Sequence, residues 1–148
     1  MINTSFLLIG WLSLAILSII SVVGDVRYRT ISNRVCVAIF VIAFLISSVP
    51  YSFTWIAKAS ALVVVCLLLY RFNFWGGGDL KLCLAFLPAV SENYLLLFLV
   101  LIGLSGGVLA GFYLLYGYLT DMSKVWSKGL PYGIPVCLSG LLCVAASL

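Results

Sequence analysis

Six apolar segments follow one another along the chain, and short polar stretches separate them. A helix of about 20 residues, rising about 1.5 Å per residue, is long enough to cross a hydrocarbon core of about 30 Å. The pattern predicts six helices, at about 5–23, 33–49, 54–73, 78–86, 94–119 and 131–148. We therefore expect an all-α, polytopic membrane protein whose six transmembrane helices form one bundle and one domain over residues 1–148. The first segment lacks a basic start, so we interpret it as a retained helix rather than a signal peptide.

The fourth segment is shorter than the others because Pro88 follows it closely. Proline lacks a backbone N–H and interrupts a helix. A segment of this length does not span a bilayer alone, so we expect a kinked or partly re-entrant helix at this point.

The fifth segment carries Gly103, Gly107 and Gly111 at intervals of four residues. Small residues at this spacing form a smooth face that favours close contact between membrane helices. We expect this face to pack inside the bundle, with dimerisation as the alternative.

Composition narrows the class of protein. With 65% hydrophobic residues, 8% charged residues and a mean hydropathy of +1.29, the chain is not a soluble domain. The net charge of +4 is small and scattered, which argues against nucleic acid as a partner. The sequence has no histidine, and its five cysteines include no Cys-x-x-Cys pair. We therefore expect no imidazole chemistry, no metal, no cofactor and no disulfide, and we interpret the cysteines as small buried hydrophobes.

Positive charge is unevenly divided between the two sides of this six-helix arrangement. The loops after the first, third and fifth helices carry or adjoin Arg27, Arg29, Arg34, Arg71, Lys81, Lys124 and Lys128. The other side is close to Lys58 alone. Because basic loops stay in the cytoplasm, the first side is predicted to be cytoplasmic and both termini to lie outside.

Asp25 and Asp79 are the candidate catalytic residues. The topology brings both to the cytoplasmic end of the bundle, Asp25 at the end of the first helix and Asp79 at the start of the fourth. Charged residues within membrane segments are costly and often functional. Two carboxylates in one poorly hydrated site do not both ionise easily, so one keeps its proton. Such a pair hydrolyses a peptide bond when one carboxylate activates water and the other protonates the carbonyl oxygen and assists the leaving amine.

Less specific roles are also open for these residues. Asp79 follows a glycine turn and is suited to capping the fourth helix. Asp25 is suited to a surface ion pair with Arg27 or Arg29. Lys81 either neutralises Asp79 or, as we favour, meets lipid phosphate or substrate, because residues two apart on a helix do not share a face. We expect the remaining acidic residues to be solvated, namely Glu92 and Asp121.

Three stretches of the sequence carry a resemblance to a known family. They are Gly76-Gly77-Gly78-Asp79-Leu80-Lys81-Leu82, Asp25-Val26-Arg27-Tyr28-Arg29-Thr30-Ile31-Ser32-Asn33 and Leu130-Pro131-Tyr132-Gly133-Ile134-Pro135. In this order they resemble the Gly-x-Gly-Asp signature, the first aspartate motif and the Pro-Tyr-Gly segment of type IV prepilin peptidases, a family of Gly-x-Gly-Asp intramembrane aspartyl proteases. Pro135 stands where the family leads us to expect alanine, and this departure bears on the local shape of the last helix.

The resemblance implies that Asp25 and Asp79 are catalytic. It implies substrate-binding or supporting roles for Gly76, Gly78, Lys81, Arg27, Asn33, Pro131, Tyr132 and Gly133. The implied reaction removes a short basic leader from prepilin-like or pseudopilin-like proteins, just before their hydrophobic helix and often after glycine. The implied location is a bacterial inner membrane, where the protein contacts lipid and cleaves at the cytoplasmic face.

Long bacterial members of the family carry an amino-terminal region whose paired cysteines bind zinc and support N-methylation, and we find no counterpart here. The chain therefore resembles the short, peptidase-only form associated with Flp (tight-adherence) pili. Archaeal preflagellin peptidases share the aspartate chemistry, so the type of substrate stays open between the two. Leader recognition also stays open among docking of the hydrophobic helix, backbone contacts at the glycine turn and acidic groups such as Asp121.

A proton-coupled transporter or channel subunit is the alternative from another class, with Asp25 and Asp79 as a proton relay. That function predicts charged groups through the depth of the bilayer, whereas both aspartates lie toward one face. A structural pilus-assembly protein is a third interpretation, but it leaves the aspartate motifs without a purpose. The sequence leaves open the oligomeric state, the particular prepilin and which aspartate holds the proton.

Overall fold

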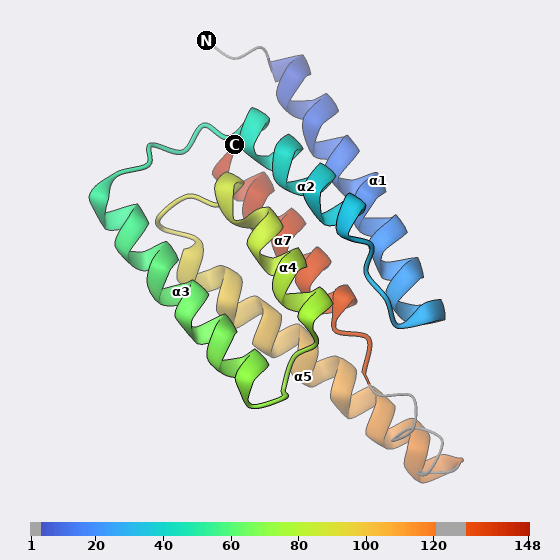
Figure 1. Ribbon diagram of the computed structural model, residues 1–148. Helices are drawn as coiled ribbons and strands as arrows, with labels where there is room; N and C mark the ends of the chain where they lie inside the picture. Colours follow the sequence, from blue (N-terminus) through green and yellow to red (C-terminus); the bar gives the residue numbers. More distant parts are fainter. Residues whose placement is uncertain (1–3, 121–129) are drawn as a thin grey trace.

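The computed structural model describes residues 4–120 and 130–148. Within these residues the chain is all-helical and contains no strand (Figure 1). In chain order its elements are α1 (Thr4–Tyr28), α2 (Asn33–Ile46), α3 (Phe53–Arg71), α4 (Gly77–Phe86), the 3₁₀ turn η1 (Leu87–Ala89), α5 (Leu95–Leu119) and α7 (Gly133–Ser147). The predicted all-α fold is confirmed, and each predicted helix has a counterpart.

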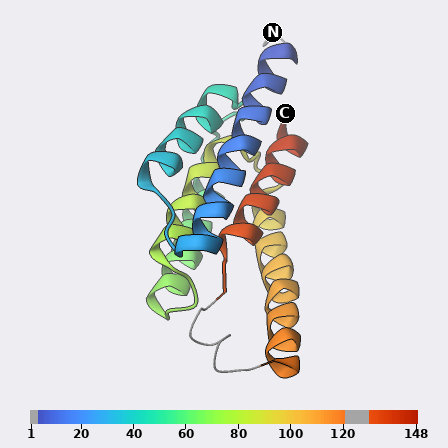
Figure 2. The ribbon, with the colours of Figure 1, turned by 90° about the vertical axis from the view of Figure 1, so that its right-hand side faces the viewer.

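Successive helices run in alternating directions along the bundle (Figure 1, Figure 2). The end of α1, the start of α4 and the start of α7 consequently lie at the same end of the bundle. We call it the aspartate end, because Asp25 and Asp79 both lie there. The start of α3 and the turn between η1 and α5 lie at the opposite end.

α4 is the central helix of the bundle, and it packs against α2, α3 and α7. Leu82, Cys83 and Phe86 on this helix are fully buried. Because its neighbours enclose it, this short helix does not have to meet lipid along a full span. All five cysteines of the chain are buried, in agreement with their interpretation as small buried hydrophobes.

Two helices end three or more residues away from their predicted ends, namely α1 and α2. α1 continues past residue 23 to Tyr28, since charged residues such as Arg27 are good helix formers, and it stops where Arg29 adopts a positive φ of 54°. α2 ends at Ile46 rather than at 49, because Ser47 already leaves the helix with an extended backbone.

The chain passes from α4 to α5 by way of a turn that contains Pro88. The short fourth helix is as predicted: its α-helical part ends at Phe86, and the 3₁₀ turn η1 carries the helical path on through Pro88 to Ala89. The carbonyl oxygen of Pro88 accepts hydrogen bonds from the hydroxyls of Ser47 and Tyr51, at 2.7 and 3.2 Å. These bonds fasten the turn to the end of α2 and to the segment that follows it.

Three helical segments are long and apolar enough to cross a membrane, namely Thr4–Tyr28, Phe53–Arg71 and Glu92–Leu119. α2 and α7 are apolar but shorter, with 14 and 15 residues, and α4 has 10. Many large apolar side chains on the outer faces of the helices are exposed, as a lipid-facing surface requires. The chain is therefore that of a membrane protein, and the count of six spans stays a prediction.

The glycine stripe of α5 does not pack inside the bundle. Gly103, Gly107 and Gly111 are exposed, and a Cβ added at any of them would meet no atom of the described residues within 4 Å. α5 instead buries a different face, which includes Phe98 and Gly106 and turns toward α7. The prediction of internal packing is wrong because a four-residue spacing marks one face of a helix without indicating which neighbour that face meets.

Candidate active site

Asp25 lies in the last turn of α1, where its side chain is buried and the residue is 7% exposed. Its Oδ2 atom accepts a hydrogen bond from the backbone N–H of Gly133 at 2.8 Å. Gly133 is the first residue of α7, and the start of a helix offers unpaired N–H groups and partial positive charge to a carboxylate. The start of α7 therefore holds the Asp25 carboxylate.

Asp79 is the third residue of α4 and is 9% exposed. Its Oδ2 atom accepts a hydrogen bond from the backbone N–H of Gly76, the residue before the helix, at 3.1 Å. The side chain thus caps α4, which is the structural role considered from the sequence. A carboxylate has two oxygens and further acceptor sites, so capping leaves Asp79 able to take part in chemistry.

The structure brings the two aspartates to one cavity of about 300 Å³ at the aspartate end. The end of α1 with the loop after it, the glycine turn and the start of α4 supply the lining residues: Asp25, Arg29, Thr30, Ile31, Gly76, Gly77, Gly78, Asp79 and Lys81. The two carboxylates are close enough for their charges to act on each other, and the charge of Arg29 also acts on Asp79. A substrate carbonyl that entered this cavity would meet acidic groups from two different helices.

Two glycines permit this arrangement by allowing close approach. A Cβ added to Gly133 would lie 2.8 Å from Oδ2 of Asp25, closer than real side chains come. A Cβ added to Gly78 would lie 3.2 Å from Cβ of Ile31. Gly133 therefore lets its own amide reach Asp25, and Gly78 lets α4 approach the loop after α1.

Lys81 lies at the border between the cavity and α2. Its Nζ atom donates a hydrogen bond to Oδ1 of Asn33 at 3.0 Å, and Asn33 is the first residue of α2. In the part of the chain that the structure describes, Lys81 and Asp79 do not form an ion pair. Lys81 therefore joins α4 to α2 rather than neutralising the neighbouring aspartate.

The Pro-Tyr-Gly segment forms the entry to α7. Pro131 is buried, and the ring of Tyr132 packs against Gly106 of α5, where an added Cβ would lie 3.0 Å from Cε1 of the ring. Gly133 follows and bonds to Asp25. Tyr132 thus fixes the start of α7 against α5, and the next residue, Gly133, holds the Asp25 carboxylate.

Pro135 causes no break in α7. It is the third residue of the helix, in the first turn, where the backbone N–H has no intrahelical partner to lose. α7 is continuous from Gly133 to Ser147, so the departure from the family pattern leaves the helix regular.

The lining of the cavity differs from the predicted site at Arg27 and at four further residues. Arg27 is exposed in the last turn of α1 and does not line the cavity. Four further residues line the cavity, namely Arg29, Thr30, Ile31 and Gly77; they lie within the two aspartate motifs, but no site role was predicted for them. For Arg29, Thr30 and Ile31 the signal in the sequence is the short segment between Asp25 and Asn33, which keeps them beside the aspartate, and for Gly77 it is the place between Gly76 and Gly78.

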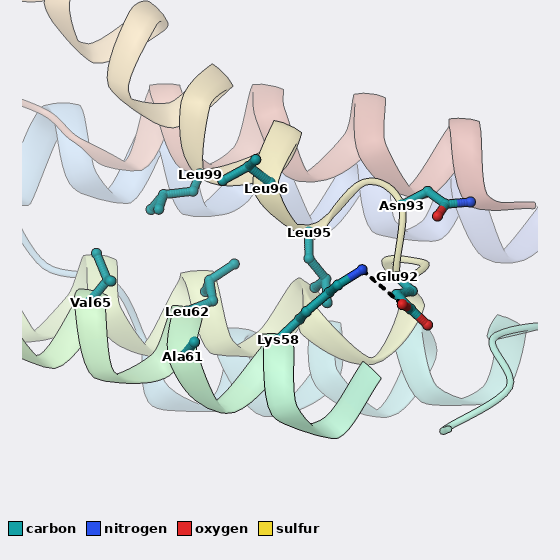
Figure 3. Close-up of a pocket in the computed structure, with 9 residues that line it drawn as sticks. All are labelled: Lys58, Ala61, Leu62, Val65, Glu92, Asn93, Leu95, Leu96 and Leu99. Atoms are coloured by element: carbon teal, nitrogen blue, oxygen red, sulfur yellow. Dashed lines mark hydrogen bonds and ion pairs between the residues drawn. The ribbon is translucent and has the colours of Figure 1, made fainter. Parts of the chain in front are cut away.

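Glu92 lies at the opposite end of the bundle, and it is more than a solvated acid. Its Oε1 atom pairs with Nζ of Lys58 at 2.8 Å (Figure 3), and its Oε2 atom accepts a hydrogen bond from the hydroxyl of Thr54 at 2.7 Å. The expectation of simple solvation was therefore incomplete. Three residues named in the sequence-based predictions lie outside the described residues: Lys124 and Lys128 of the charge argument, and Asp121, which we expected to be solvated.

The fold and the cavity together define a helical membrane protein with a pair of buried carboxylates at one end. The sequence profile of the type IV leader peptidase family matches residues 12–121, a range that includes both Asp25 and Asp79. The chain belongs to this family, as the resemblance indicated, and it is a leader-peptidase-like protease and hence a hydrolase. No curated protein and no solved structure matches the chain.

Proposed function

We propose that the protein is a membrane aspartyl endopeptidase that removes the short basic leader of prepilin-like proteins, with Asp25 and Asp79 as its catalytic pair. The observation that carries this proposal is the cavity that both carboxylates line, although they come from different helices. Family membership supports leader cleavage as the type of reaction. Asp25 and Asp79 are also the only buried charged residues among those the structure describes.

In the proposed reaction the two carboxyl groups divide the proton transfers between them. The ionised one takes a proton from water as the water oxygen attacks the carbonyl carbon of the scissile peptide, and the protonated one donates to the carbonyl oxygen. The tetrahedral intermediate then collapses, the C–N bond breaks, and the amine leaves with a proton from the pair. Hydrogen bonds from Gly133 and Gly76 hold the carboxyl groups in position for these transfers.

The charge distribution supports a cytoplasmic position for the aspartate end. The helix ends that meet there (Figure 1) carry or adjoin basic side chains, namely Arg27, Arg29, Arg34, Arg71 and Lys81, whereas Lys58 is near the start of α3, which lies at the opposite end. Under the positive-inside rule, the leader is cut at the cytoplasmic face of a bacterial inner membrane, and both termini lie outside.

The proposed substrates are prepilin-like or pseudopilin-like proteins in which a hydrophobic helix follows the leader, as in Flp-type (tight-adherence) pilus assembly. The cavity contains the basic residues Arg29 and Lys81 beside the two acids, so charge alone does not draw a basic leader into it. A proton relay across the membrane, the competing function, needs further buried charged groups, and the described residues contain none.

Co-expression with prepilins encoded nearby tests the proposal, with leader removal followed by gel shift and by mass. The wild type is expected to cut, while Asp25→Asn and Asp79→Asn, still folded and membrane-inserted, are expected to leave the leader in place. Glu92→Gln is the matched control, because it makes the same chemical change at the opposite end of the bundle. Normal processing by either aspartate variant would rule out the catalytic pair.

A further inference from the structure

A second hollow lies directly beside the aspartate cavity. It is a groove of about 420 Å³ between α2 and α4, and it is lined by Asn33, Cys36, Val37, Phe40, Lys81, Leu84 and Ala85. Val37 is 61% exposed and Phe40 is 47% exposed, so the groove opens on the outer surface of the bundle. Apart from Asn33 and Lys81, its lining carries no strongly polar side chain.

The groove and the aspartate cavity share Lys81. The hydrogen bond of 3.0 Å between Lys81 and Asn33 crosses from α4 to α2 where the two hollows meet. Asp79 precedes Lys81 by two residues on α4 and lines only the cavity. An extended chain that passes this hydrogen bond therefore goes from a polar cavity with two carboxylates to an apolar groove.

The lining of the groove suits an apolar helix. On α2, Asn33, Val37 and Phe40 are three or four residues apart and so lie along one face of the helix. On α4, Leu84 and the small Ala85 form the facing wall. Helices pack with their axes about 8–10 Å apart when the side chains between them allow it, and a small residue at the contact favours such an approach.

We infer that this groove binds the apolar segment that follows the scissile peptide bond of the substrate. The inference rests on the proposed function, in which the peptide bond lies at Asp25 and Asp79 while the next residues stay in the membrane. The groove adjoins the cavity at Lys81, which lines both, so a helix that lies against α2 and α4 brings its first residues past Lys81 and toward the carboxylates. Docking of the hydrophobic helix is thus the means of recognition, and the leader needs no attraction to basic loops.

A larger groove of about 480 Å³ between α3 and α5 does not fit this role (Figure 3). Its walls include Leu62 and Leu99, and the ion pair between Lys58 and Glu92 lies at one end of it. It shares no lining residue with the aspartate cavity, and its polar residues lie at the opposite end of the bundle. A helix bound there does not present its first peptide bond to Asp79.

Position-specific photo-crosslinking tests the contact. The probe is a synthetic substrate made of a short basic leader, a glycine and an apolar helix of about 20 residues, which is long enough to span a bilayer. Asp79→Asn keeps the probe intact, and a benzophenone amino acid replaces Val37 in one variant and Val108 in the other. The two valines are 61% and 60% exposed, and Val108 lies on α5, outside the groove. We expect a crosslink to the apolar helix of the probe from position 37 and only background from position 108.

A crosslinking result of either other kind would overturn the inference. Equal yields from positions 37 and 108 would mean that the probe meets the bundle without preference. A crosslink from position 37 to lipid alone would mean that lipid, and not the substrate helix, occupies the groove.

Cleavage kinetics of the same probe supply a second test. Val37→Trp fills the groove, and we expect it to raise KM by about tenfold or more with kcat little changed, because it removes binding and not chemistry. Val108→Trp is expected to change neither constant, and melting temperatures in detergent show that both variants are folded. An unchanged KM in Val37→Trp would overturn the groove as a binding site without contradicting the proposed aspartyl protease.

Cleavage of the probe by Asp79→Asn would instead overturn the proposed function. The crosslinks would then still show whether the apolar helix binds in the groove.

Discussion

The backbone N–H of Gly133 donates a hydrogen bond to Oδ2 of Asp25 at 2.8 Å, and this bond joins the start of α7 to the end of α1. Asp25 lies in the last turn of its own helix, where the helix dipole disfavours negative charge. The start of α7 offers the opposite end of a dipole and offsets that cost. One glycine amide therefore fixes the orientation of a carboxylate that we propose to be catalytic.

Gly133→Ala is expected to lower the rate of leader cleavage by about tenfold or more. The added Cβ would lie 2.8 Å from Oδ2 and 3.1 Å from Cβ of Asp25, so the carboxylate has to move away from its donor. A hydrogen bond to a charged group contributes about 1.5–3 kcal/mol, and about 1.4 kcal/mol in the barrier is a factor of ten in rate. The measurement is the cleavage rate of a co-expressed prepilin per amount of membrane-inserted enzyme.

The matched control for that variant is Gly103→Ala on α5, where an added Cβ meets no described atom within 4 Å. It is expected to cut the prepilin at the wild-type rate. Wild-type cleavage by Gly133→Ala as well would show that the contact between Gly133 and Asp25 does not matter for the reaction.

Gly78→Val is expected to reduce cleavage, and Ile31→Ala in the same chain is expected to restore part of it. A Cβ at position 78 would already lie 3.2 Å from Cβ and 3.3 Å from Cγ1 of Ile31, so a larger side chain pushes α4 away from the loop after α1. Ile31→Ala removes the outer atoms of that contact and lets α4 return. Because the two positions touch, their effects on the rate should be strongly non-additive.

Rates of the two single variants and the double variant measure this coupling. A general misfolding of Gly78→Val predicts no rescue, because removing side-chain atoms at another position does not repair it. A double variant that cuts no faster than Gly78→Val would therefore show that the close approach of α4 to Ile31 is not the cause of the loss.

The meeting of Asp25 and Asp79 could be predicted from the sequence, because alternating apolar segments fix the path of the chain. The depth of each charged residue at the end of a segment is then known relative to the membrane, and two such residues on the same side of the membrane become neighbours. The hydrogen bonds that hold the pair could not be predicted in this way. The contact between Gly133 and Asp25 depends on how α7 approaches α1. The contact between Lys81 and Asn33 depends on the rotation of α4 about its axis. Hydropathy predicts neither the approach nor the rotation.

The glycines of α5 also show which contacts could not be predicted from the sequence. The spacing of Gly103, Gly107 and Gly111 correctly indicates a smooth helix face, but the face that packs in the bundle contains Gly106. Tyr132 from the start of α7 lies against that glycine, and this distant side chain decides which face of α5 is buried. Periodicity identifies faces, whereas contacts between distant segments assign them to partners.

Ser47→Ala is expected to lower stability by about 1 kcal/mol without affecting cleavage. The Ser47 hydroxyl donates to the carbonyl oxygen of Pro88 at 2.7 Å in a partly buried position, and such a bond contributes about 0.5–1.5 kcal/mol net. The Tyr51 hydroxyl also donates to that oxygen, so the oxygen keeps a partner in the variant. Thermal unfolding in detergent measures the loss, and Ser13→Ala, whose hydroxyl bonds within its own helix at an exposed position, is the control. An unchanged melting temperature would show that this bond does not hold the turn.

Lys81→Met and Lys58→Met form a matched pair at the two ends of the bundle. Lys81→Met is expected to lower the cleavage rate by about tenfold, because it breaks the hydrogen bond to Asn33 and removes a charge from the border of the aspartate cavity. Lys58→Met breaks the ion pair with Glu92, but this pair is partly exposed and lies away from the cavity, so cleavage should stay at the wild-type rate. Cleavage rates in equal amounts of inserted enzyme compare the two variants.

Lys81→Gln separates the two contributions of Lys81 to that rate. Its amide can still donate a hydrogen bond to Asn33 but carries no charge. Wild-type cleavage by Lys81→Gln would therefore show that the hydrogen bond between α4 and α2 is what matters for the rate. A loss equal to that of Lys81→Met would show that the charge matters. Equal losses in Lys81→Met and Lys58→Met would point to a general effect of lysine on membrane insertion and would remove Lys81 from the site. Because the same chemical change is made at both ends of the bundle, the comparison tests the location of the active site as well as the role of one residue.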